Sequence, residues 1–199
     1  MLITNCKYSL NYLIAIIMFR KLFNNELNRI SVEEFKNVTK TPIVLILDNI
    51  RSQHNIGAAF RTSDAFCLEK IYLCGICATP PTPEIHKSAL GAEFSMDWEY
   101  ADNAIDVVRR LKSEGYVIVS VEQAEHSTML HNFTHEQGKK YAYIFGNEVK
   151  GVQQEVVDES DLCVEIPQFG TKHSLNVSVS IGVVLWEVTR NDINRLSNK

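Results

Sequence analysis

Three segments of the sequence combine side chains that could bind or act on a ligand with glycines that let the backbone turn sharply. They are Asp48–Thr62 (DNIRSQHNIGAAFRT), Ile144–Gly151 (IFGNEVKG) and Ile166–Ser178 (IPQFGTKHSLNVS). Each begins at the end of a short apolar run of the kind that forms a buried strand. Because α/β proteins build their sites where the strands end, we expect the three segments to meet at one edge of a sheet.

The first segment offers a phosphate-binding group. Asn55 and Gly57 open a predicted helix, and Arg61 and Thr62 follow one to two turns later. The planar guanidinium fork of an arginine carries five N–H donors and matches a phosphate. A single arginine on a helix can also be a solvated residue, but Asn55 and the small residues at the helix entrance favour a functional role for Arg61.

The two later segments could bring backbone atoms close to a ligand. Gly146 and Gly151 bracket Glu148, although glycine next to asparagine also forms ordinary turns. Ser174 and Asn176 stand at the start of the last predicted helix, whose free N–H groups and positive dipole end suit a carboxylate or phosphate. Both residue types are also ordinary helix caps.

The elements that position these segments alternate between strand and helix. The predicted strands are Ile43–Leu47, Ile71–Cys74, Tyr116–Val121, Tyr141–Phe145 and Leu162–Ile166. The predicted helices are Ile56–Phe66, Asn103–Lys112 and Asn176–Val188. This alternation predicts an α/β fold with a parallel sheet and helices on both faces.

The last helix is apolar on two sides. One face carries Val177, Ile181, Val184 and Val188, and the other carries Val179, Val183 and Trp186. A helix that is apolar nearly all round must be covered all round. We therefore predict a homodimer through this helix, with Ser178 and Gly182 allowing close approach.

Composition limits the class of protein. The 199 residues are 45% hydrophobic, enough for one sizeable core, and 20 basic against 24 acidic residues give a net charge of -4. That charge excludes a polybasic, histone-like nucleic-acid binder. Five cysteines without a dense framework indicate the cytoplasm rather than a secreted disulfide scaffold. Cys74 and Cys77 form a lone CxxC without further ligands at a metal-site spacing, so we predict no metal.

The N-terminal part is predicted to be an extension over residues 1–40, followed by the site-bearing domain over residues 41–199. The apolar run Leu10–Phe19 is too short to span a membrane and lacks a small-residue cleavage site after it. Translation could start at Met18, which would leave residues 1–17 upstream. A helix within Arg20–Lys40 is expected to pack on the domain through Leu22, Leu27, Ile30, Val32 and Phe35.

The glycine fingerprints of Rossmann dehydrogenases, P-loop NTPases and class I methyltransferases do not occur in the sequence. Instead, the three segments closely resemble the motifs of the SpoU/TrmH family of RNA 2'-O-ribose methyltransferases, over about Thr41–Arg190. The first motif, N-x-G-A-x-x-R-T, is matched by Asn55, Gly57, Ala58, Arg61 and Thr62. The second, F-G-x-E-x-x-G, is matched by Phe145, Gly146, Glu148 and Gly151. The third, I-P-x-x-G-x-x-x-S-L-N-V-S, is matched by Ile166, Pro167, Gly170, Ser174, Leu175, Asn176, Val177 and Ser178.

This resemblance implies a C-terminal trefoil knot, an exception to the rule against threaded chains, with S-adenosylmethionine bound inside it. The resemblance to the family implies that Gly146, Ile166 and Leu175 hold the adenosine through backbone atoms. Ser174 and Asn176 line the reaction site, with Arg61, Asn55 and Glu148 completing it and the strand end Val121–Gln123 contributing. The partner subunit is expected to help shape the RNA site.

The implied function is methylation of a ribose 2'-hydroxyl in tRNA or rRNA. An arginine is effectively always protonated, so we expect Arg61 to grip a phosphate and stabilise developing charge, with the proton passing to phosphate or water. Glu148 is expected to order Arg61 or its loop. A non-catalytic RNA-binding or ribosome-assembly protein on the same fold is the alternative, and it predicts loss of the arginine or of the cofactor loops. A small-molecule methyltransferase is a third option, against which Arg61 argues.

The RNA-binding surface is less well defined by the sequence. Because the net charge is negative, a basic patch must be local, and its candidates are Arg20, Lys21, Arg29, Lys36 and Arg51 with Arg61. His86 and Lys87, within Thr79–Glu93, either contact a nucleotide or belong to a surface loop. Forty N-terminal residues are too few for an RNA-binding domain with its own core, so the target nucleotide stays open.

Overall fold

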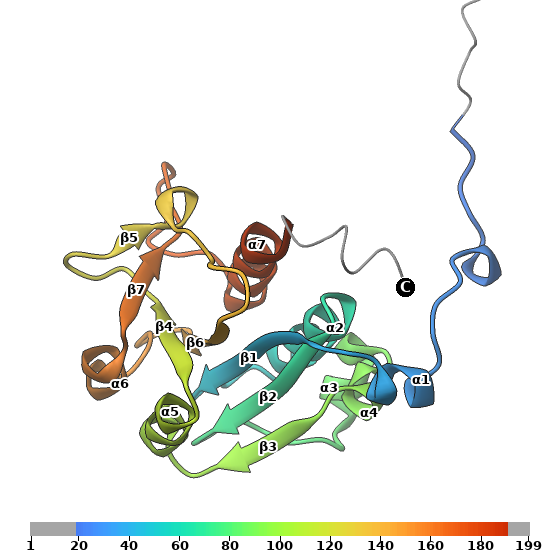
Figure 1. The fold of residues 1–199 in the computed structure, drawn as a ribbon, viewed down its shortest axis with the longest axis horizontal. Coiled ribbons are helices and arrows are strands. Elements are labelled where there is room, and N and C mark those ends of the chain that lie inside the picture. Colours follow the sequence, from blue (N-terminus) through green and yellow to red (C-terminus); the bar gives the residue numbers. More distant parts are fainter. Residues whose placement is uncertain (1–18, 191–199) are drawn as a thin grey trace, which may run out of the picture. The chain divides into compact units, whose positions relative to one another are not determined.

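The computed structural model describes residues 19–190 (Figure 1). The predictions about residues 1–17, the start at Met18 and most of the apolar run Leu10–Phe19 fall outside these residues. The chain divides into one unit that ends at Ile30 and a second that begins at Ser31. The first unit contains a single 3₁₀ turn within its described residues, η1 (Asn24–Glu26), where the Glu26 carboxylate pairs with Arg20 at 2.7 Å.

A seven-stranded sheet forms the centre of the second unit. Its strands are β1 (Thr41–Asp48), β2 (Leu68–Cys74), β3 (Trp98–Ala101), β4 (Tyr116–Val121), β5 (Thr128–Met129), β6 (Lys140–Gly146) and β7 (Leu162–Glu165). The strand order is β3-β2-β1-β6-β4-β7-β5, and every neighbouring pair is parallel. The carboxyl ends of the strands therefore share one edge. Strands β2 and β3 lie on one side of β1 and the later strands lie on the other, so the topological switch point falls between β1 and β6.

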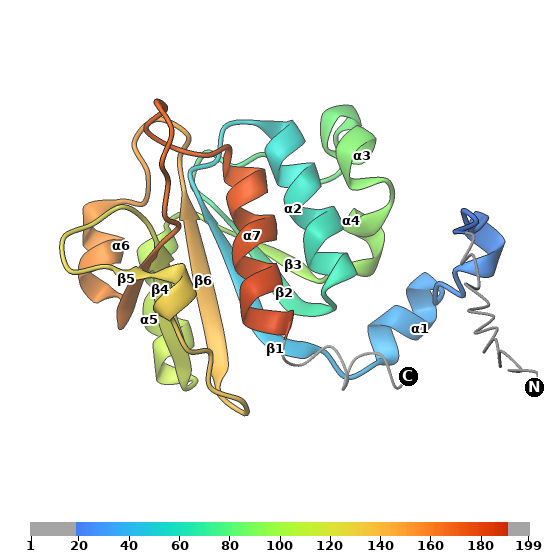
Figure 2. The same cartoon turned by 90° about the horizontal axis from the view of Figure 1, so that it is seen from above.

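Helices cover both faces of the sheet, as predicted. One face carries α1 (Val32–Asn37), α2 (Gln53–Ala65), α3 (Pro83–Ala89), α4 (Ala92–Ser95) and α7 (Val177–Thr189). The other face carries α5 (Ala104–Ser113) and α6 (Gln154–Glu159). Figure 2 shows α7 running beside α2, and both helices start at the edge where the strands end. The α/β prediction is thus confirmed, while the trefoil knot stays a prediction.

Successive side chains of β1 point to opposite faces of the sheet, which gives the protein a core on each face. Ile43 and Leu45 pack into the cluster under α2 and α7, whereas Val44 and Ile46 pack under α5. All four side chains are buried. A strand buried on both faces has a continuous apolar sequence, which is why β1 and its central neighbours were visible in the sequence.

The helix expected within Arg20–Lys40 is present but is limited to α1. Ser31 accepts a hydrogen bond from the Glu34 N–H, and the Glu34 carboxylate accepts one from the Ser31 N–H. This capping box starts α1 at Val32, so the apolar residues before it lie outside the helix. Of the five apolar residues expected to pack, Phe35 alone is buried.

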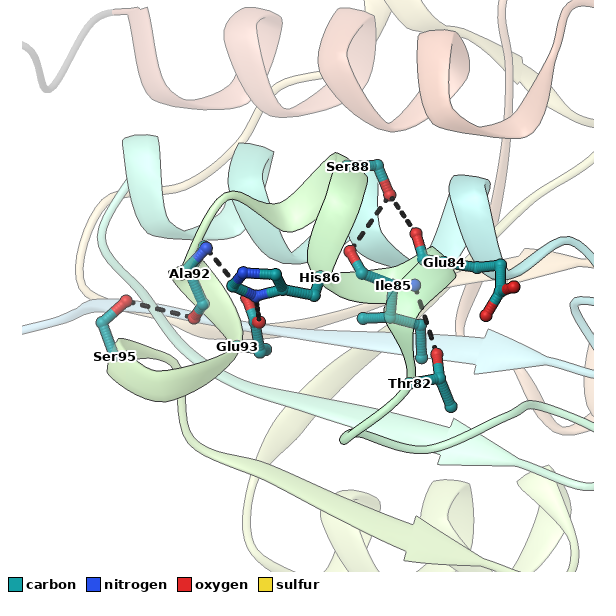
Figure 3. A network of polar contacts seen from close by, with 9 residues as sticks. Thr82, Glu84, Ile85, His86, Ser88, Ala92, Glu93 and Ser95 are labelled. Atoms are coloured by element: carbon teal, nitrogen blue, oxygen red, sulfur yellow. Dashed lines mark hydrogen bonds and ion pairs between the residues drawn. The ribbon is translucent and has the colours of Figure 1, made fainter.

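Within the segment Thr79–Glu93, His86 and Lys87 lie on the helix α3 rather than in a surface loop. The Thr82 side chain caps α3 by accepting from the Ile85 N–H at 3.2 Å, and Pro83 occupies the first turn. Figure 3 shows the polar contacts that follow, in which His86 Nδ1 lies 2.5 Å from the Glu93 carboxylate, whose other oxygen accepts from Gly91 N–H at 3.0 Å. His86 keeps most of its side chain exposed.

Gly57 allows α2 and α3 to touch. A Cβ at this position would overlap with the Ser88 hydroxyl and with the carbonyl oxygen of Ile85. Gly57→Ala is therefore expected to lower the free energy of unfolding by about 1–3 kcal/mol, because the α3 backbone must move. Urea denaturation measures this change. Gly170→Ala is the control, since nothing lies within 4 Å of its added Cβ; an equal effect of both variants would contradict the packing argument.

Candidate functional site

A cavity of about 610 Å³ opens at the carboxyl ends of β4, β6 and β7. Three loops form its wall: Val121–Gln123 after β4, Phe145–Gly151 after β6, and the segment from Glu165 to Val177 between β7 and α7. Two of these loops are the glycine-containing segments found in the sequence. The cavity therefore lies where the strand pattern placed it.

Most of the predicted site residues line this cavity. They are Gly146, Glu148, Ile166, Ser174, Leu175 and Asn176. Asn55 and Arg61, both on α2, do not belong to its wall. The structure thus brings the second and third segments together around the cavity and leaves the first segment beside it.

Asn55 connects the three segments. Its Nδ2 donates to Glu148 Oε1 at 3.0 Å, and its Oδ1 accepts from Asn176 Nδ2 at 3.2 Å. Asn176 also caps α7, since its Oδ1 accepts from the Ser178 N–H at 2.9 Å. The start of α2, the loop after β6 and the start of α7 are therefore held by one side chain.

Glu148 acts as an acceptor for the loop after β1. Its carboxylate accepts from the backbone N–H groups of Arg51 and Ser52, each at 3.1 Å, besides the Asn55 amide. Partial burial raises the pKa of Glu148, but hydrogen bonds from Arg51, from its own backbone, and from Asn55 and Ser52 together lower it below the ordinary value. Glu148 is thus an anion that orders the loop, and it forms no ion pair or hydrogen bond with Arg61.

This arrangement predicts a pH-dependent contribution to stability. A lowered pKa in the folded state means that the Glu148 anion stabilises the fold above the ordinary value of 4.5 and loses this effect as the pH falls through the lowered pKa. At pH 7, Glu148→Gln should cost about 1 kcal/mol, allowing for solvent screening at this exposed site. Denaturation from pH 7 to pH 3 should show the difference shrinking. Glu155→Gln, on exposed α6, is the control, and a pH-independent cost would refute the role.

Arg61 is free to bind an external anion. It lies exposed on α2 and makes no hydrogen bond or ion pair with any of residues 19–190. Because no internal carboxylate neutralises it, its guanidinium is available to a phosphate. Among the other candidates for a basic patch, Lys36 and Arg51 are exposed in the same unit as Arg61, while Arg20, Lys21 and Arg29 lie in the unit that ends at Ile30.

Gly146 and Gly151 allow the loop after β6 to close on itself. Asn147 and Gly151 exchange two backbone hydrogen bonds of 3.0 and 2.8 Å. A Cβ on Gly146 would overlap with the backbone of Gly151 and Val152, and one on Gly151 would overlap with the Glu122 carboxylate. The glycines therefore serve close backbone packing in the cavity wall rather than an ordinary turn.

Two acidic residues at strand ends were not singled out in the sequence, although they lie within the named segments Val121–Gln123 and Asp48–Thr62. Glu122 accepts from the Val152 N–H at 2.9 Å and from the Gln123 N–H at 2.8 Å, which ties the loop after β4 to the loop after β6. Asp48, fully buried, accepts from the backbone and side-chain amides of Gln153, each at 2.9 Å. Their signal in the sequence was a carboxylate directly at the end of an apolar strand.

The CxxC cysteines belong to the core. Cys74 and Cys77 are buried, and burial raises the pKa of the Cys77 thiol to about 11. Cys77 Sγ accepts from the Ile50 N–H at 3.2 Å and donates to the Leu47 carbonyl at 3.3 Å. Within residues 19–190, no group of three or more His, Cys, Asp or Glu side chains could hold a metal ion.

Residues 42–186 match the model of the SpoU rRNA Methylase family. The chain belongs to this family. The family predicted from the three motifs is therefore confirmed. The match takes in all three motif segments and every strand of the sheet except the first residue of β1.

Named relatives of this SpoU-family chain include enzymes that act on rRNA and on tRNA. It is 32% identical over 164 residues to the 23S rRNA (guanosine-2'-O-)-methyltransferase RlmB of Neisseria meningitidis, covering 82% of this chain and 64% of the relative. It is 31% identical over 152 residues to the tRNA (guanosine(18)-2'-O)-methyltransferase of Aquifex aeolicus, covering 74% of this chain and 69% of the relative. The chain thus spans less than two thirds of the Neisseria protein.

Solved structures show the same fold. The AdoMet-bound rRNA methyltransferase of Sinorhizobium meliloti aligns with a TM-score of 0.71 at 26% identity, over 79% of this chain and 60% of that one. The A. aeolicus TrmH/SpoU tRNA modifying enzyme aligns with a TM-score of 0.73 at 26% identity, over 82% of each chain. The predicted fold class of this SpoU-family chain is thereby confirmed.

Proposed function

We propose that the protein is an S-adenosylmethionine-dependent methyltransferase that methylates a ribose 2'-hydroxyl in tRNA or rRNA. The observation that carries this proposal is the cavity built from the second and third motif segments, with Asn55 linking them to the first. The relatives named as 2'-O-methyltransferases and the AdoMet-bound Sinorhizobium structure support it.

The cavity fits the cofactor chemically. Its apolar lining side chains suit an adenine ring, and they are Val121, Phe145, Val149, Ile166, Leu175 and Val177. Three carboxylates, of Glu122, Glu148 and Glu165, give the wall a negative potential that suits a positively charged sulfonium. Gly146, Ile166 and Leu175 would hold the adenosine through backbone atoms, and Ser174 would lie at the reaction site with Asn176.

When bound, S-adenosylmethionine supplies a methyl group on a positively charged sulfur. Asn55 and Asn176 keep the cavity wall in register with α2, which fixes where a ribose can enter. Arg61 binds the phosphate next to that ribose and stabilises negative charge that develops on the 2'-oxygen. The hydroxyl proton passes to this phosphate or to water, because Glu148 is already occupied by three N–H donors.

The exposed face of α7 supports a homodimer. Val179, Val183 and Trp186 are 50%, 39% and 54% exposed, whereas Ile181, Val184 and Val188 on the other face are buried. Nothing lies within 4 Å of a Cβ built on Gly182, so a second backbone could approach there. We propose that a second copy covers this face and contributes to the RNA site, with His86 and Lys87 as further nucleotide contacts.

Trp186→Glu is expected to turn the dimer into a monomer, because a charge would be buried in the apolar contact. Sedimentation velocity measures the change. Leu162→Glu, an exposed apolar residue on β7, is the matched control and should leave the dimer intact. A wild-type protein that sediments as a monomer would refute the dimer.

The cytoplasm is the proposed location, supported by free thiols at Cys67, Cys74, Cys77 and Cys163. No helix within residues 19–190 is long and apolar enough to cross a membrane.

The proposed activity is tested with S-adenosylmethionine that carries a tritiated methyl group. The protein is incubated with total tRNA and, separately, with total rRNA, and acid-precipitable label is counted. Label in one pool supports the proposal and identifies the substrate class. No label in either pool, together with no cofactor binding by calorimetry, would favour the non-catalytic RNA-binding alternative.

A further inference from the structure

The tip of the loop between β7 and α7 projects from the rim of the cavity. Gln168 and His173 line the cavity, and the four residues between them are exposed. Phe169 is 97% exposed, so its ring makes almost no contact with the rest of the chain. An aromatic ring held in water at the mouth of a site has both faces available for stacking.

The same rim carries two ammonium groups without an acidic partner. Lys172 follows Phe169 in the exposed loop tip, and Lys150 lines the cavity from the loop after β6. Neither forms an ion pair with a carboxylate among residues 19–190. The carboxylates of Glu122 and Glu148, in contrast, already accept backbone N–H groups. Each of these two ammonium groups is therefore available to an external phosphate, although the cavity wall behind them carries three carboxylates.

The neighbours of Phe169 distinguish it from the apolar face of α7. Trp186 shares its face with the exposed side chains of Val179 and Val183, a continuous apolar surface that suits a protein partner. Phe169 stands between Gln168 and Gly170, with Thr171 and Lys172 beyond. A single aromatic ring among amides, hydroxyls and ammonium groups suits a nucleic acid, whose bases stack on aromatic rings while lysines bind its phosphates.

We propose that Phe169 stacks on an unpaired RNA base beside the ribose that enters the cavity, and that Lys150 and Lys172 bind the flanking phosphates. This inference rests on the proposed function and identifies part of its substrate: the target nucleotide lies in a single-stranded loop or bulge, where a base can leave its own stack. Paired A-form RNA keeps its bases stacked and offers none to this ring.

A fluorescence titration tests the contact directly. Phe169→Trp places an indole at the loop tip, and its signal is compared with that of the wild type, which contains Trp98 and Trp186. Total tRNA and total rRNA are titrated separately into both proteins. Stacking predicts quenching of Phe169→Trp beyond that of the wild type with at least one pool. Equal quenching of both proteins by both pools would overturn the inference.

Kinetics test the consequence for RNA. Loss of one base–aromatic stack should raise the KM for RNA by about 10-fold in Phe169→Ala, with Phe169→Leu intermediate and Phe169→Trp near the wild type. Leu162→Ala, at the opposite edge of the sheet, is the matched control and should not change KM. Cofactor affinity and sedimentation should be unchanged in all variants. Reduced cofactor affinity in Phe169→Ala would show a cover over the cofactor instead, and a shift to monomer would show a protein contact; either result would overturn the inference.

Failure of this inference and failure of the proposed function give different results. If the wild type transfers methyl groups and the Phe169 variants have its KM, the function stands and the stacking contact is refuted. If the wild type neither binds the cofactor nor methylates RNA, the proposed function fails. The fluorescence titration still reports stacking in that case, because it does not require transfer.

Discussion

Replacing Arg61 with Ala is expected to lower methyl transfer to RNA by about 100- to 1,000-fold while cofactor affinity stays at the wild-type level. Arg61 is exposed on α2, does not line the cavity and has no partner among the described residues. Its removal therefore disturbs neither the fold nor the cavity wall. What is lost is the cation that grips the phosphate and stabilises charge on the attacking oxygen.

Transfer kinetics and calorimetry with S-adenosylmethionine measure the two effects separately. Arg61→Lys should recover only part of the activity, because an ammonium group lacks the bidentate fork of a guanidinium. Arg109→Ala is the matched control, since Arg109 pairs with Glu159 at 3.1 Å on the face that carries α5 and α6. An equal loss of transfer and of cofactor binding in Arg61→Ala would contradict the role assigned to Arg61.

Gly146→Ala is expected to weaken cofactor binding by about 100-fold or more, because no volume exists for the added methyl group. The Cβ would overlap with backbone atoms of Gly151 and Val152, which a side-chain rotation cannot relieve. The loop after β6 must then move, and it carries Glu148 with its bonds to Arg51 and Ser52.

Calorimetry with S-adenosylmethionine measures this loss, and circular dichroism reports whether the sheet survives. Gly138→Ala is the matched control. Gly138 precedes the start of β6, away from the cavity, and nothing lies within 4 Å of its added Cβ. Its backbone φ of 85° makes the alanine strained by about 1 kcal/mol, but the cavity is untouched. Cofactor binding by Gly146→Ala at the level of Gly138→Ala would contradict the structure of the wall.

Burial explains which elements could be predicted from the sequence. β1 and β6 lie in the middle of the sheet and are covered on both faces, so each is a continuous apolar run. β3 and β5 are edge strands, short and half-buried, and they lack such a run. α3 was not among the predicted helices, and its Pro83 occupies the first turn of a helix capped by Thr82.

The site was predictable as three segments but not as a network. Residue types identified Asn55, Glu148 and Asn176, yet the hydrogen bonds that join them connect positions about a hundred residues apart and follow only from the packed sheet. The absence of Arg61 from the cavity wall depends on how α2 lies against α7, which one sequence does not show.

The most direct test of the central claim is the chemical position of the transferred methyl group. RNA labelled by the protein is digested with ribonuclease T2, which needs a free 2'-hydroxyl for cleavage, and the products are separated by mass. Ribose methylation predicts the label in cleavage-resistant dinucleotides. Label in mononucleotides with a methylated base would contradict the account.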